Sequence, residues 1–155
     1  MPGLRPDDAR PDPLSAELEQ LPEVQERWQE FEATVWSGAV DPVLLELCRL
    51  RVATLLGDEP GMGLRTKAAV AAGLGEDLVD ALPNWSVSPR FGPSERAALA
   101  IAELFVIDAH AVTDEMCAEL LAEVGDARAT ALTMGIALFD ATSRARIALT
   151  ATAGA

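Results

Sequence analysis

Apolar residues recur at helical spacing along most of the chain, and no segment shows the strict alternation that is typical of a strand. Between Pro22 and Val35 the apolar positions are separated by four, three and four residues, at Val24, Trp28, Phe31 and Val35. We expect Trp28 and Phe31 to be core or subunit-interface residues, because large aromatic side chains contribute most to burial. The pattern predicts an all-α protein.

A second helix is expected to begin at Asp41 and to end at Gly57. Asp41 can accept hydrogen bonds from free amide groups at a helix start, and Pro42 loses no hydrogen bond at the first helical position. The same apolar spacing places further helices at residues 62–72, 95–109, 113–124 and 127–149, with a short amphipathic turn at residues 76–82. Gly73 is the expected left-handed stop of the first of these. The last is apolar almost all round, so we expect it to be central or at an oligomer interface.

The length of 155 residues suits a single domain. Residues 1–12 are rich in proline and charge, so we expect a mobile N-terminal arm, followed by one helical domain at residues 13–151. The arm lacks the apolar core of a signal peptide, which favours a cytoplasmic protein. The two cysteines, Cys48 and Cys117, lie far apart on apolar stretches and do not indicate a disulfide framework.

The charge balance excludes two classes of partner. Twelve basic and 25 acidic residues give a net charge of −13 and a pI near 4.3. Nucleic acid and anionic membrane surfaces would be repelled, so neither is an expected partner. No apolar run approaches the roughly 20 residues that a membrane span requires.

Candidate chemistry is concentrated between Asp41 and Gly73, where ionisable residues lie among apolar ones, at Glu46, Arg49, Arg51, Asp58 and Arg65. Buried ionisable groups are costly unless they are paired, so this stretch is a site or the remainder of one. His110 is the only histidine, and its position near a helix end fits a structural role as well as a catalytic one. One histidine and two separated cysteines match no metal-ligand spacing, and no phosphate-binding loop is present, so we expect neither metal nor cofactor.

Several separate blocks resemble one family. LRVATLLG at residues 50–57, TKAAVAAG at 66–73, FGPSERAALAIAELF at 91–105 and AHAVTDE at 109–115 are similar to the carboxymuconolactone decarboxylase and alkylhydroperoxidase-D-like (AhpD-like) proteins. The resemblance covers roughly residues 41–147. It implies an AhpD-like helical bundle that assembles as a homo-oligomer, often a trimer or hexamer.

The peroxidase branch of this family carries a glutamate, then a Cys-x-x-Cys pair, then a histidine. The resemblance places Glu46 on the glutamate, Asp58 and Gly61 on the two cysteines, and Arg65 on the histidine. Peroxide reduction of this type needs a nucleophilic thiolate and a resolving thiol, which Asp and Gly cannot supply. Thiol-dependent alkyl hydroperoxidase activity is therefore the least favoured function.

Two other functions stay open. One is an acid/base enzyme acting on a small organic acid or lactone, with Glu46 as base, Arg65 as anchor for an anionic substrate, and Asp58 or His110 assisting. The other is a catalytically silent oligomeric scaffold or interaction protein, in which Glu46, Asp58 and Arg65 form only a structural ion pair.

Overall fold

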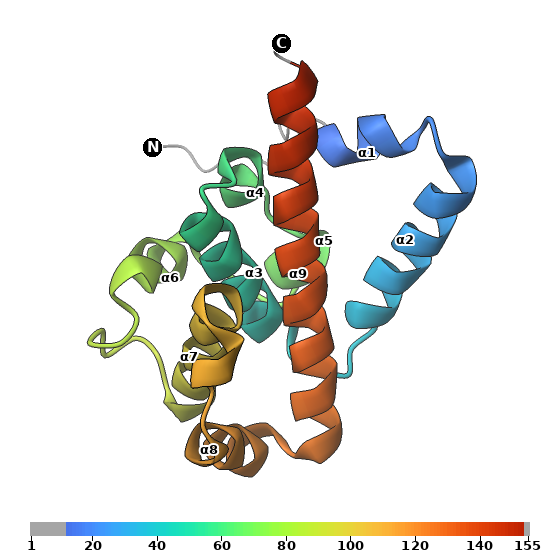
Figure 1. Ribbon diagram of the computed structural model, residues 1–155. Helices are drawn as coiled ribbons and strands as arrows, with labels where there is room; N and C mark the ends of the chain where they lie inside the picture. Colours follow the sequence, from blue (N-terminus) through green and yellow to red (C-terminus); the bar gives the residue numbers. More distant parts are fainter. Residues whose placement is uncertain (1–11, 154–155) are drawn as a thin grey trace.

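The computed structural model describes residues 12–153, and every regular element in this range is helical (Figure 1). The elements are α1 (Pro13–Leu18), α2 (Pro22–Val35), α3 (Pro42–Leu56), α4 (Glu59–Gly63), α5 (Lys67–Ala71), α6 (Glu76–Ala81), η2 (Leu82–Asn84), α7 (Pro93–Ile107), η3 (Ala109–Ala111), α8 (Asp114–Val124) and α9 (Asp126–Ala153). The predicted all-α fold class is confirmed. The expected arm at residues 1–12 lies, except for Asp12, outside the described residues. No helix in the described range is long and apolar enough to cross a membrane.

Helix α3 is buried over most of its length and supports the rest of the fold. The Asp41 carboxylate accepts a hydrogen bond from the Leu44 amide at 3.0 Å, and Pro42 occupies the first turn. Gly57 ends the helix with a φ of 72°, a left-handed conformation that glycine adopts without strain. Both predicted ends of this helix are therefore confirmed. The helix packs against α7 and α9, which together enclose the main core.

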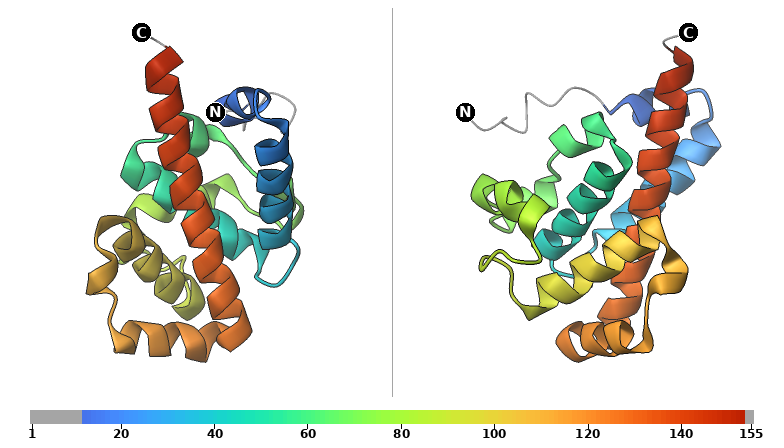
Figure 2. Two further views of the ribbon diagram at one scale, coloured as in Figure 1. Left: turned by 45° about the vertical axis from the view of Figure 1, so that its right-hand side comes forward. Right: turned by 60° about the vertical axis from the view of Figure 1, so that its left-hand side comes forward.

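Helix α9 runs the full length of the molecule (Figure 2). It contacts α3, α7 and α8, and also α1 and α2. Contact with so many elements explains why its sequence is apolar on several sides. Because α1 is short and begins just after the proline-rich segment, the apolar pattern did not predict it.

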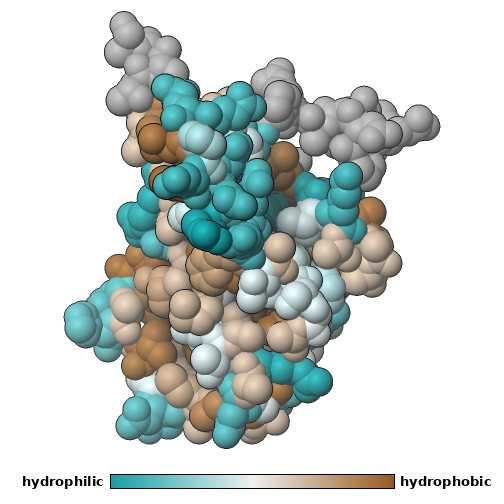
Figure 3. Space-filling view, turned by 90° about the vertical axis from the view of Figure 1, so that its right-hand side faces the viewer, coloured by the Kyte–Doolittle hydropathy of each residue, from teal (hydrophilic) through white to brown (hydrophobic). Residues whose placement is uncertain are grey.

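Helix α2 lies beside α9 and has no fully buried residue. Trp28 is partly buried against the core, whereas 37% of Phe31 is exposed. The prediction that Phe31 is a core residue is therefore wrong for a single chain, and its alternative role at a subunit interface stays a prediction. From the α2 side, hydrophilic residues cover the upper part of the surface and more hydrophobic ones the lower part (Figure 3).

The segment after α3 differs from the single helix expected at residues 62–72. It forms two short helices, α4 and α5, separated by an extended segment in which Leu64 and Thr66 have ψ angles of 148° and 142°. The physical reason is that side chains of α3 take the backbone groups that would otherwise continue the helix: Arg49 binds two carbonyl groups and Glu46 binds the Thr66 amide. Gly73 follows α5 with a φ of 96°, as predicted.

Candidate functional site

Glu46 is completely buried on α3, and both of its carboxylate oxygens are fully engaged. Oε1 accepts hydrogen bonds from Arg49 Nη2 at 2.8 Å and from the Thr66 amide at 3.0 Å. Oε2 accepts from Arg49 Nε at 2.9 Å and from Thr66 Oγ1 at 3.0 Å. A carboxylate that already accepts four hydrogen bonds has little capacity left for a substrate.

Arg49, rather than Arg65, is the partner of Glu46. Its guanidinium also donates to the carbonyl oxygens of Gly61 at 2.8 Å and Leu64 at 2.7 Å. Arg49 thereby connects α3 to α4 and to the extended segment. The spacing of three residues between Glu46 and Arg49 on one helix was the sequence signal for this pair.

Arg65 does not pair with Glu46, contrary to expectation. It forms a two-pronged ion pair with Glu76, with Nε–Oε1 and Nη2–Oε2 distances of 2.9 and 3.0 Å. It also donates to the carbonyl oxygens of Met62 and Leu64. The Arg65 side chain follows the extended segment outward because Arg49 already occupies the space beside Glu46.

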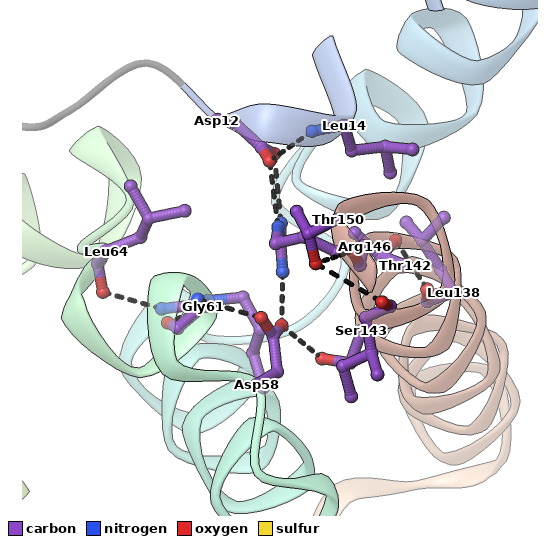
Figure 4. A network of polar contacts seen from close by, with 12 residues as sticks. Asp12, Leu14, Asp58, Gly61, Leu64, Leu138, Thr142, Ser143, Arg146 and Thr150 are labelled. Carbon is purple, nitrogen blue, oxygen red and sulfur yellow. Dashed lines mark hydrogen bonds and ion pairs between the residues drawn. The ribbon is translucent and has the colours of Figure 1, made fainter. Parts of the chain in front are cut away.

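Asp58 is also completely buried and connects α4 to α9 (Figure 4). Its Oδ1 accepts from the Gly61 amide at 3.1 Å, which caps the start of α4. Its Oδ2 accepts from Ser143 Oγ at 2.8 Å and from Arg146 Nη1. Asp58 is therefore a structural ion-pair partner of Arg146, a residue that the sequence analysis did not select.

Gly61 is required by this arrangement. A Cβ atom at position 61 would overlap the Asp58 carboxylate and would lie 2.9 Å from Arg146 Nη1. Any larger residue, including the cysteine that the resemblance implies at this position in peroxidase relatives, would displace the ion pair. Asp58, Gly61 and Arg146 therefore form one interdependent unit.

Arg146 completes the network by binding Asp12, the first described residue. Its Nε and Nη2 donate to the two Asp12 oxygens at 2.8 and 2.9 Å. Burial would raise the pKa of Asp12, but hydrogen bonds and charge from Arg146 and the Leu14 amide lower it overall. The pKa of Arg146 is raised: burial opposes this, but the two aspartates outweigh it.

A cavity of about 190 Å³ lies beside this network, between α2, α9 and the segment after α4. Its lining residues are Asp12, Glu32, Trp36, Arg49, Leu64, Arg65, Thr66, Leu138, Phe139, Thr142, Ser143 and Arg146. Glu46 and Asp58 do not line it; they lie behind Arg49 and Arg146. The cavity thus combines guanidinium groups with aromatic and aliphatic walls.

Of the two carboxylates that line this cavity in the described part of the chain, Glu32 is the one without an ion pair to an arginine. Burial and the negative charge of Asp12 raise the pKa of Glu32. The neighbouring Trp28 indole and the positive charge of Arg146 lower it, but by less. The Trp28 indole lies close to Glu32, but its Nε1 makes no hydrogen bond of acceptable geometry within the described residues. Glu32 was missed because it is not part of the apolar stripe that predicted α2, and only the position of α2 beside α9 reveals it.

The remaining candidates lie apart from this network. His110 is exposed on η3, where its amide donates to Asp108, and it makes no hydrogen bond or ion pair with Glu46 or Asp58. Cys48 is buried, which raises its pKa to about 12, and Cys117 is exposed on α8. Among residues 12–153 no group of three or more His, Cys, Asp or Glu side chains is arranged to hold a metal ion.

Comparison with known protein families gives a match to this chain. The sequence model of the carboxymuconolactone decarboxylase family matches residues 22–104, more than half of the chain, and this region includes α2, α3 and the α4–α5 corner. A search of curated proteins found no significant match. The helical fold agrees with the AhpD-like architecture expected from the resemblance. The chain therefore belongs to the carboxymuconolactone decarboxylase family.

Proposed function

We propose that this protein is an enzyme that acts by acid/base chemistry on a small organic acid or lactone, in the cavity between α2 and α9. The observation that carries the proposal is Glu32, a half-buried carboxyl group with a raised pKa that faces a cavity lined by arginines. Raised pKa values of this kind are typical of general acids and bases. The proposal moves the proton-transfer role from Glu46 to Glu32.

Glu46 and Asp58 act as positioning residues in this proposal. Glu46 fixes Arg49, and Asp58 fixes Arg146, so that both guanidinium groups are held rigidly at the cavity wall. Rigid, buried support of a charged side chain lowers the cost of binding an anion. Arg65 contributes at the rim, where Glu76 holds it.

The proposed reaction is the decarboxylation that the family name describes. The carbon–carbon bond to the carboxylate breaks, its electron pair is delocalised toward the carbonyl group of the lactone, and CO₂ leaves. Protonated Glu32 then gives its proton to carbon and regains one from water. A positioned acid contributes typically about 10²- to 10⁴-fold to such a step.

The test is CO₂ release from carboxymuconolactone by the purified protein. We expect Glu32→Gln to lower kcat at least about 100-fold. Glu30→Gln on the same helix is the matched control, because Glu30 forms an exposed pair with Arg27 at 2.9 Å and does not line the cavity. Unchanged activity of Glu32→Gln, or no CO₂ release by the natural sequence, would refute the proposal.

A second candidate is a catalytically silent oligomeric scaffold. The complete pairing of Glu46 and Asp58 favours it, as do exposed apolar residues along α2, where Val24 is 48% and Phe31 37% exposed. Apolar residues gathered on one surface are typical of protein interfaces. A stable oligomer in sedimentation that releases no CO₂ from carboxymuconolactone would support this candidate.

A thiol peroxidase is not proposed. Peroxidase chemistry requires a thiolate, and the raised pKa of Cys48, about 12, keeps that thiol protonated at neutral pH. Cys117 lies on α8 and does not line the cavity. Turnover of an alkyl hydroperoxide with a thiol reductant would contradict this exclusion.

A further inference from the structure

Arg146 presents two different edges to its partners. Nη1 points inward to the buried Asp58 carboxylate, whereas Nε and Nη2 point to Asp12 (Figure 4). The outer pair of bonds, at 2.8 and 2.9 Å, is the parallel two-bond geometry by which arginine recognises carboxylates. The inner bond fixes the guanidinium, and the outer edge is a preformed fork.

Asp12, which occupies this fork, is more exposed to solvent than Asp58, the other carboxylate bound to Arg146. The Asp12 side chain is 26% exposed, compared with 5% for Arg146 and 0% for Asp58. Asp12 precedes the first turn of α1 and itself lines the cavity, so it can leave the fork without disturbing α3 or α9. Of the two anions on Arg146, Asp12 is the one that solvent reaches.

We propose that the Arg146 fork is a binding subsite for the carboxylate of a small organic acid, and that Asp12 is an internal occupant which this ligand displaces. The inference rests on the proposed function only in taking the same cavity as the ligand site. Trp36, Leu138 and Phe139 line that cavity and provide an apolar wall for the body of the acid. A volume of about 190 Å³ suits a single small acid.

The tethered Asp12 sets how strongly such a ligand binds. Because Asp12 is attached to the same chain, its carboxylate competes at an effective concentration on the order of millimolar or more. A free acid therefore binds the natural sequence weakly, and removing the Asp12 charge raises the apparent affinity. Only the state in which Asp12 has left the Arg146 fork can bind the carboxylate of the ligand.

The experiment measures benzoate binding by calorimetry and by tryptophan fluorescence, to which Trp36 at the cavity contributes, with benzamide as the uncharged analogue. We expect Asp12→Asn to bind benzoate at least about tenfold more tightly than the natural sequence. Asparagine still caps α1, so the helix is retained. Asp41→Asn is the matched control, because Asp41 caps α3 in the same way but lies away from this cavity. Asp12→Ser, whose side chain is too short to occupy the fork, should show the same gain.

Three results would overturn the inference: no gain in either Asp12 variant, an equal gain for benzamide, or an equal gain in Asp41→Asn. A second test removes the Arg146 guanidinium together with the Asp58 charge, so that no buried charge is left without a partner. The neutral double variant Asp58→Asn/Arg146→Gln should lose benzoate binding, and retained binding would refute the assignment. Failure of the proposed function appears separately, as unchanged CO₂ release in Glu32→Gln, and leaves the binding result intact.

Discussion

Replacing Glu46 by glutamine tests whether the buried pair with Arg49 stabilises the fold. Glutamine keeps the shape of the side chain but retains only one acceptor oxygen. If that oxygen takes the place of Oε1, it keeps its bonds to Arg49 Nη2 and the Thr66 amide. The amide group then faces Arg49 Nε, a donor, and Thr66 Oγ1, which can turn to accept a hydrogen bond.

The expected cost follows from this partner list. One charge-assisted hydrogen bond is lost, which is worth about 1.5–3 kcal/mol, and the guanidinium loses its counter-charge. Removing one partner of a fully buried pair typically costs about 3–5 kcal/mol. Because Arg49 is 13% exposed and keeps the carbonyl groups of Gly61 and Leu64, we expect the lower end of that range, about 3 kcal/mol.

The assay is urea unfolding monitored by circular dichroism. We expect the dependence of the free energy of unfolding on urea concentration to have the same slope in the variant as in the natural sequence. The melting temperature should fall by roughly 6–12 °C. Asp140→Asn is the matched control: the same charge is removed from a partly exposed pair with Arg144, and the expected loss is at most about 0.5 kcal/mol. If Glu46→Gln lost no more than this control, the interpretation of Glu46 as a stabilising partner of Arg49 would be wrong.

Three further predictions concern other parts of the site. Gly61→Ala should destabilise the fold by about 2 kcal/mol or more in the same urea assay, because its Cβ overlaps Asp58, whereas Gly63→Ala, which has open space, should cost less than about 1 kcal/mol. Native protein treated with iodoacetamide at pH 8 should be labelled once, at Cys117, and Cys48 should react only after unfolding; two labels in the native state would contradict the burial. Because the folded state raises the pKa of Glu32, the free energy of unfolding should decline as pH rises from the unfolded value near 4.5 through the folded pKa, and Glu32→Gln should remove this decline.

The helical framework could be predicted because its signals are local. Asp41–Pro42 and Gly57 fix the two ends of α3, and the structure confirms both. The segment after α3 could not be predicted in the same way, because its backbone bonds go to Arg49 and Glu46, which are distant in sequence. Apolar periodicity predicts a helix whose backbone groups bond to one another, whereas the backbone groups of this segment bond to side chains of α3.

The candidate site was predicted in part. Glu46 and Asp58 were correctly expected to need partners, since both are completely buried and both are paired. The identity of those partners depends on packing: Arg146 is 88 residues from Asp58 and lies on a helix that was expected to be central or at an oligomer interface. Asp12 was assigned to a mobile arm, and Glu32 was not among the candidate residues.

The network also explains why the residues at positions 58, 61 and 146 depend on one another. A buried aspartate at position 58 requires a cation, and the Arg146 guanidinium reaches it only if position 61 has no Cβ. Aspartate, glycine and arginine are thus mutually dependent, and changing one alone leaves a buried charge or a steric overlap. A cysteine at position 61 would therefore require Arg146 Nη1 to move away from the new Cβ, and this movement would break its bond to Asp58.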